Sequence, residues 1–221
     1  MPPVFGEQLF GPEGLGTSFK IIAVLSALSL LPAVILTVTS FVRTIVVLSF
    51  IRQGIGSQET PPNQVMIGLA MFLTLFVMTP VMNEIKAQGI DPYMAGEIGE
   101  AKALENALVP LRSFMLRHTR QADLALFYNA TETDLPQTPD DVSMRMAIPA
   151  YIVSELTTAF QMGVIVLLPF LVVDLAVASL LMSMGMMMVP PVTISLPLKL
   201  LLFVLVDGWN LVAGSLLKSF A

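Results

Sequence analysis

The stretch that decides the fold is AIPAYIVSELTTAFQMGVIVLLPFLVVDLAVASLLMSMGMMMVPP, residues 147–191. It is part of an apolar run from Met146 to Leu217 that contains four charged residues: Glu155, Asp174, Lys199 and Asp207. This run is long enough for two helices of the ~20 residues that a hydrocarbon core requires. Because the segment from Gly185 to Pro191 interrupts it, we predict helices over 146–184 and 194–217, the second broken further at Pro197.

Two shorter charge-poor stretches, 21–42 and 60–83, predict a first hairpin with a polar turn between them. The predicted fold class is therefore all-α, with two long hydrophobic helical hairpins joined by a polar, partly helical segment. Kinks are expected at Pro80, Pro149 and Pro169. The predicted segments are a flexible N-terminal part (1–18), the first hairpin (19–83), the polar, mainly helical part (84–145) and the second hairpin with its methionine-rich loop (146–221).

Composition places the chain at a membrane and excludes several classes of site. Hydrophobic residues make up 55% of the chain and charged residues 12%, which is far from an ordinary soluble domain. The net charge of −5 argues against a nucleic-acid partner. The chain has no cysteine and one histidine, His118, so neither a thiol site nor a multi-histidine metal site is expected. Enzyme motifs are absent, and we expect no catalysis and no cofactor.

The polar segment from Glu84 to Arg145 holds sixteen of the 27 charged residues, ten of them acidic. Apolar residues recur in it at spacings of three and four, which predicts a helix that breaks or bends near Pro110; they are Ile98, Ala101, Leu104, Leu108, Leu111 and Met115. A loop is predicted over 129–141. Since Arg43 and Arg52 flank the first turn, the positive-inside rule places that turn in the cytoplasm and the acidic middle segment outside.

Charged residues within apolar sequence are the first candidates for a functional role, because each costs roughly 2.5–3.5 kcal/mol at a bilayer centre. Glu155 and Lys199 have opposite signs and lie on different predicted helices. We predict an ion pair between them, within or between subunits. The alternative is that such residues lie near helix ends and reach water, and for Asp207 beside Gly208 the two interpretations are evenly balanced.

Four polar residues share one face of the third hydrophobic helix, at spacings of three, four and seven: Ser154, Thr157, Thr158 and Gln161. Such a face either forms hydrogen bonds between helices that hold subunits together or lines a wet channel.

The methionine segment includes Met184, Met186, Met187 and Met188 and ends at Pro190-Pro191. Methionine packs adaptably because it is unbranched and polarisable. Core filling, Cu(I) binding and a flexible apolar constriction of a pore are the three interpretations, and the constriction is favoured because apolar rings can close a pore by excluding water.

Six strings along the chain resemble the FliP/SctR family of type III export-gate proteins, and the resemblance extends from about Phe19 onward. They are PPNQV from Pro61, GLAMFLT from Gly68, PLRSFMLRHT from Pro110, SELTTAFQ from Ser154, GMMMVPP from Gly185 and LVDGW from Leu205. Flagellar members commonly begin with a cleaved signal peptide, whereas SctR proteins of virulence systems usually lack one. The N-terminal stretch here does not have the pattern of a signal peptide, so we expect either that none is used or that it has been removed. The Pro190-Pro191 pair looks more flagellar.

The resemblance implies a homo-oligomer that joins FliQ and FliR in a helical ring around a pore, with FlhB and FlhA as further partners. Unfolded flagellar proteins would cross the bacterial inner membrane through it, driven by the proton motive force and a separate ATPase. By that resemblance Met186, Met187 and Met188 form a gasket in the pore, and Glu155 with Lys199 links neighbouring subunits. It also implies that the apolar helices lie largely above the bilayer, packed on one another.

Three alternatives stay open: an SctR-type virulence subunit, a small-solute or ion transporter that uses Glu155 and Asp174, and a purely structural nucleus for assembly.

Overall fold

The computed structural model describes residues 12–57, 60–133, 136, 138–186 and 188–220. Within these ranges every regular element is helical and no strand occurs, so the predicted all-α class is confirmed. The elements are α2 (Pro12–Thr37), α3 (Phe41–Ile55), α4 (Asn63–Ile85), the π-helical η1 (Lys86–Ile90), α5 (Asp91–Met94), α6 (Glu100–Arg117), α7 (Gln121–Ala130), the 3-10 turn η2 (Pro139–Asp141), α8 (Met144–Ser183), α9 (Val192–Leu205) and α10 (Gly208–Lys218).

The chain divides into two compact units, and helix α2 makes up the described part of the first. Its apolar side chains, such as Ile22 and Leu30, are exposed. The helix begins at Pro12, within the segment 1–18 that we predicted to be flexible; residues 1–11 lie outside the described part.

The helix predicted over 21–42 ends early, and a separate helix follows it. Helix α2 stops at Thr37 and α3 begins at Phe41. Short hydroxyl side chains between them bond to the backbone: Thr37 Oγ1 donates to the Val34 carbonyl oxygen (2.9 Å), and the Phe41 N–H donates to Thr39 Oγ1 (3.4 Å). Such bonds compete with a continuing helix. We predicted that Arg43 flanks the first turn, and this is wrong. Arg43 is buried near the start of α3, whereas the turn follows the end of α3 at Ile55.

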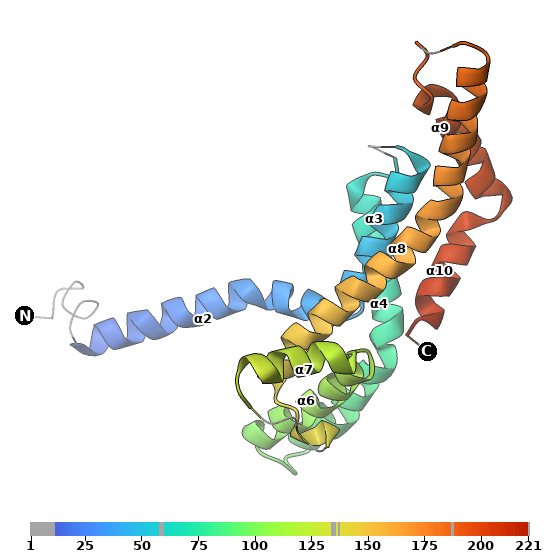
Figure 1. The fold of residues 1–221 in the computed structure, drawn as a ribbon. Coiled ribbons are helices and arrows are strands. Elements are labelled where there is room, and N and C mark those ends of the chain that lie inside the picture. Colours follow the sequence, from blue (N-terminus) through green and yellow to red (C-terminus); the bar gives the residue numbers. More distant parts are fainter. Residues whose placement is uncertain (1–11, 58–59, 134–135, 137, 187, 221) are drawn as a thin grey trace, which may run out of the picture. The chain divides into compact units, whose positions relative to one another are not determined.

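Helix α8 organises the second unit, which comprises residues 38–220 (Figure 1). Its 40 residues span roughly 60 Å at 1.5 Å per residue. One apolar core joins its C-terminal half to α3, α4, α9 and α10, with Leu48, Ile51, Met66, Phe170 and Phe203 among its residues. A second core joins its N-terminal part to α4, α6 and α7 and includes Met78, Phe114, Met115, Tyr128 and Tyr151.

Glycines let α3 and α8 approach closely. A Cβ atom added at Gly163 would lie 2.2 Å from the Phe50 ring, and one at Gly54 would lie 2.6 Å from the Phe170 ring. Neither position can take a larger side chain without moving an aromatic ring. Small residues at such contacts are typical of helices that pack in or near membranes.

The second hairpin breaks at Asp207 and not at Pro197. Pro197 lies inside α9, whereas Asp207 has a φ of 51° and separates α9 from α10 at a bend of 63°. A Cβ atom at Gly208 would lie 2.3 Å from the Phe203 ring. The bend therefore needs a glycine next to a residue in the left-handed region, which aspartate tolerates better than most. Asp207 is exposed, which favours the alternative that it lies near a helix end and reaches water.

The middle segment matches the prediction in part. Helix α6 contains Pro110 and does not end there. Along the predicted apolar stripe, Met115 is buried, whereas Leu104 is 62% exposed. The predicted loop matches the described residues after α7, apart from the short turn η2.

Within the described residues, two helical stretches are long and apolar enough to cross a membrane: Asn63–Met94 and Met144–Ser183. Up to four such segments result if each bent helix pair counts as one.

We predict that Gly163→Ala loosens the contact between α3 and α8. Alanine raises helix propensity at both Gly163 and Gly68, but a Cβ atom at Gly68 meets nothing within 4 Å. The difference between the two variants therefore isolates overpacking, which typically costs about 1–3 kcal/mol. Denaturant unfolding of the protein in detergent measures it, and equal stabilities for Gly163→Ala and Gly68→Ala would contradict the close contact.

Candidate functional site

The Glu155 carboxylate is completely buried and forms an ion pair with Arg43. Arg43 Nε donates to Glu155 Oε2 at 2.9 Å, and Nη2 donates to Oε1, so both carboxylate oxygens accept a bond. The side chains are 4% and 0% exposed, respectively. Two parallel bonds of this kind fix geometry as well as charge. Helix α3 is therefore joined to α8 near the middle of the unit by a bidentate pair that the sequence did not reveal.

Lys199 has a different partner from the predicted one. Its Nζ donates to Asp174 Oδ2 at 2.5 Å and links α9 to α8. The Lys199 side chain is 7% exposed and that of Asp174 is 38% exposed. The ammonium also lies near Gly56, the C-cap of α3, where a positive charge is favourable.

Glu155 and Lys199, predicted as a pair, are thus each engaged with another residue of the same chain. Pairing across a subunit boundary stays a prediction, since the structure holds one chain. Sequence reasoning did single out Asp174 as a charge in apolar sequence, but it assigned Arg43 to a turn.

The predicted polar face of α8 divides into a buried and a more open part. Ser154 Oγ donates to Asp123 Oδ2 at 2.6 Å and accepts from the Arg120 N–H at 3.0 Å, which joins α8 to the start of α7. Thr157 Oγ1 donates to the Val153 carbonyl oxygen of its own helix. Thr158 is half-buried, and Gln161 is exposed. Ser154 therefore fits the interpretation of hydrogen bonds between helices, here within one chain.

The hydrogen bonds that Asp123 accepts at this joint between α7 and α8 keep its side chain ionised. Arg120 donates to both of its oxygens, at 2.8 and 3.1 Å. The hydrogen bonds from Arg120, with a further bond from Ser154, hold the pKa of the Asp123 carboxyl below its ordinary value, although burial opposes the shift.

The methionine segment forms the connection between α8 and α9. Gly185 has a φ of 76°, which turns the chain back after α8. Met184 is 69% exposed, Met186 41% and Met188 98%. Met187 lies outside the described residues. The thioethers of Met184, Met186 and Met188 are thus available to contacts beyond the chain, so core filling within the chain does not account for these three residues.

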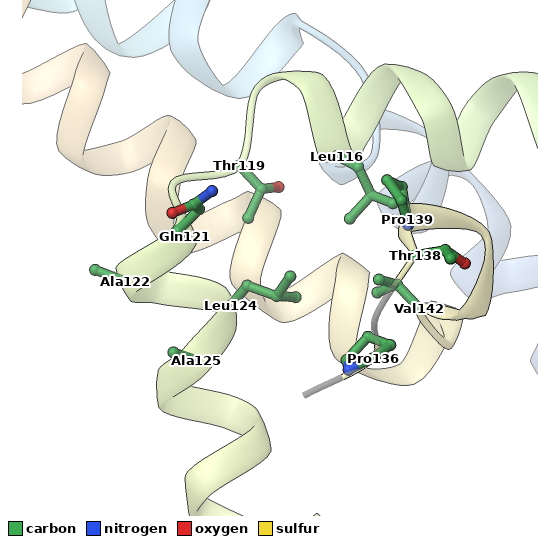
Figure 2. Close-up of a pocket in the computed structure, with 10 residues that line it drawn as sticks. All are labelled: Leu116, Thr119, Gln121, Ala122, Leu124, Ala125, Pro136, Thr138, Pro139 and Val142. Carbon is green, nitrogen blue, oxygen red and sulfur yellow. The ribbon is translucent and has the colours of Figure 1, made fainter. Parts of the chain in front are cut away.

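A pocket of about 610 Å³ lies in the middle segment, between the end of α6, α7 and the residues before α8 (Figure 2). Leu116, Leu124 and Val142 form its apolar wall, and Thr119 and Gln121 are polar residues at its edge. Among the residues that the structure describes, no titratable side chain lines it. Among the described residues no cluster of His, Asp or Glu could hold a metal ion.

Comparison with known proteins gives one consistent result. A model of the FliP family matches residues 24–216. The chain is 48% identical over 209 residues to the flagellar biosynthetic protein FliP of Bacillus subtilis (strain 168), which covers 95% of both chains. Its identity to the protein of the same name is 50% over 210 residues in Pectobacterium carotovorum subsp. carotovorum, covering 95% of this chain and 81% of the relative. Its identity to the protein of the same name in Aquifex aeolicus (strain VF5) is 42% over 222 residues, covering 100% of this chain and 92% of the relative.

We predict that Glu155→Gln lowers the free energy of unfolding by about 3–5 kcal/mol, because it leaves the buried Arg43 without its anion. The double variant Arg43→Met, Glu155→Met should recover part of this loss, since no unpaired charge remains. The control is Glu105→Gln in the Lys102–Glu105 pair, whose side chains are 58% and 67% exposed. Such a pair contributes about 1 kcal/mol or less. Equal losses at Glu155 and Glu105 in denaturant titrations would contradict the structural role.

The joint at Asp123 predicts a defined pH dependence. The pKa of Asp123 is lower in the folded than in the unfolded protein. The ionised carboxylate therefore contributes to the free energy of unfolding at pH values above its unfolded-state pKa of about 3.9. This contribution is lost as pH falls through the folded-state pKa. Wild type should therefore exceed Asp123→Asn in stability at pH 5–8, and the difference should shrink below about pH 4. Unfolding of both proteins across pH 3–8 measures this. A constant difference down to pH 3 would show that the charge of Asp123 is irrelevant.

Proposed function

Because the chain belongs to the FliP family, we propose that it is a pore-forming subunit of the flagellar type III protein export gate. In this role it passes unfolded flagellar proteins across the bacterial inner membrane. The relatives that support the flagellar rather than the virulence assignment are named as flagellar biosynthetic proteins and match over most of their length.

The observation that carries the proposal is the amount of apolar surface left uncovered on α8. Exposed apolar side chains extend along it from Leu156 to Met182, including Ile165, Val172 and Leu175 at 65–74% exposure. That interval covers about 40 Å of helix at 1.5 Å per residue, whereas a hydrocarbon core is about 30 Å thick. Lipid alone therefore cannot cover the surface of an upright α8, and other protein chains must contribute.

A ring of further copies, joined by FliQ and FliR, supplies such cover. Apolar side chains are also exposed on α4 and α9, including Phe72, Phe76, Leu201 and Val204. Of these helices, α9 packs against α8, whereas α4 packs against α3 and α6 of the same unit. Uncovered apolar surface on several helices is what we expect of a subunit that has a neighbour on each side, as a closed ring requires.

The methionine segment is then the constriction of the pore. At the turn between α8 and α9, neither Met186 nor Met188 belongs to either core, and Met188 is 98% exposed. Flexible apolar side chains can close on one another when no substrate is present, and can adapt to a polypeptide that changes sequence as it moves. The gasket consists of Met186, Met187 and Met188.

The subunit performs no chemistry of its own in this proposal. Export energy comes from the proton motive force and a separate ATPase, with FlhA and FlhB as further partners. The protein lies in the inner membrane at the flagellar basal body, with its middle segment extracytoplasmic. The transporter alternative is weaker, because Glu155 and Asp174 already pair with cations of the same chain.

We predict that replacing Met186, Met187 and Met188 together by Ala leaves assembly intact and raises ion leakage through the closed gate several-fold, because alanine is too short to close the ring. Conductance of the reconstituted complex measures leakage, and native electrophoresis measures assembly. Met94→Ala, at an 80% exposed methionine outside the loop, is the control. Failed assembly would favour the structural alternative, and unchanged leakage through an intact complex would refute the gasket.

A further inference from the structure

The two residues after α10, Ser219 and Phe220, lie against Arg43 of α3. Arg43 Nη1 donates to the Ser219 carbonyl oxygen at 2.9 Å and to Ser219 Oγ at 3.0 Å. The guanidinium carbon lies 3.9 Å from the centroid of the Phe220 ring, which is a cation–π contact. The same arginine that binds Glu155 thus also holds the end of α10.

The Phe220 ring also packs on α6. Its centroid lies 6.2 Å from that of Phe114, with the rings nearly parallel, and 5.2 Å from that of His118. His118 is fixed in turn, since its Nδ1 lies 2.8 Å from the Phe114 carbonyl oxygen. We call the group formed by Arg43, His118, Ser219 and Phe220 the clasp.

Helix α10 has a bend at one end and the clasp at the other. The 63° bend at Asp207 separates it from α9. Between these points a narrow stripe, Gly208, Val212 and Leu216, is buried. Trp209 and Leu211 are 41% and 59% exposed. A helix held by one stripe and one terminal contact is the kind of element that opens locally without global unfolding.

We propose that the clasp is an acid-sensitive latch: neutral His118 keeps it closed, and protonation of His118 opens it and releases α10. An imidazolium at this site places a second cation beside the ring that Arg43 already faces. Among the described residues, the charged groups that act on His118 are Arg43 from α3 and Arg117 from α6, both positive. The carboxylate of Glu155, on α8, is the anion bound to Arg43, which engages both of its oxygens.

The direction of the pH effect follows from burial. Burial lowers the pKa of His118 below 6.5, and the charges of Arg43 and Arg117 act in the same direction, whereas the carbonyl oxygens of Phe114 and Phe220 oppose it. A folded-state pKa below the unfolded value means that unfolding of the clasp takes up a proton. The closed clasp is therefore most stable above pH 6.5 and weakens as pH falls below that value.

Hydrogen exchange of the full chain in detergent, read by mass spectrometry on peptides covering 208–218, tests the latch. Wild type and His118→Gln are compared at the same pH from 7.5 to 5.0, so that the intrinsic exchange rate cancels. Exchange of α10 in wild type should rise relative to the variant by up to about tenfold per pH unit below 6.5, because one proton is taken up per opening. Phe220→Leu, which removes the cation–π contact, should show raised exchange throughout with little dependence on pH.

Peptides from α3 in the same samples are the internal reference. Selective exchange of α10 in wild type supports the latch. An equal rise in α3 and α10 means general acid unfolding and overturns it, as does an identical pH response in wild type and His118→Gln. Should His118→Gln fail to fold, a pH response in Phe220→Leu as steep as that of wild type would overturn it equally. The latch does not depend on the gasket, so either can fail alone.

Discussion

A carboxylate buried within an apolar helix needs a cation beside it, and Arg43 is the cation that pairs with Glu155. The rest of the second unit is arranged around this pair. Glu155 lies on α8 between Tyr151, which belongs to one core, and Ala159, which belongs to the other. Its bidentate pairing sets the register of α3 against α8, where Gly163 allows close contact. The Nη1 group of Arg43, which does not bind Glu155, donates to Ser219. One guanidinium therefore connects α3, α8 and the end of α10.

Length and charge spacing were enough to predict that the main apolar segments are helical, because membrane-type helices are defined by the absence of charge over about 20 residues. They did not predict the number of helices, since α2 with α3, and α9 with α10, each replace a single predicted helix. The boundaries were harder to predict. The break at residues 38–40 comes from hydroxyl groups that bond to the backbone, and that at Asp207 comes from a left-handed residue packed beside Phe203. In the sequence, Pro197 and Pro110 look like stronger helix breakers than the residues at either of these breaks. In the structure, however, α9 continues through Pro197 and α6 continues through Pro110.

For the site, sequence reasoning chose important residues but not their partners. Glu155, Asp174 and Lys199 were identified because each is costly in apolar sequence, and all three are paired. The partner of Glu155 lies 112 residues away. No spacing rule links residues at such a separation, and Arg43 was assigned to a turn because it lies close to the end of an apolar stretch. For Ser154, bonding between helices was one of two alternatives and was expected between subunits, whereas its partner Asp123 lies on α7 of the same chain and depends on how the middle segment folds back.

Helix α8 has a consequence for how the protein is made. With apolar side chains such as Phe160, Leu168 and Leu171 uncovered, a copy without neighbours carries the kind of surface that aggregates or is recognised by proteases. In the assembly that we propose, cells therefore have to synthesise this chain in proportion to the chains that cover it, and a surplus copy is a liability rather than a reserve. Supply of neighbours, more than the intrinsic stability of one chain, would then set how much of the protein accumulates.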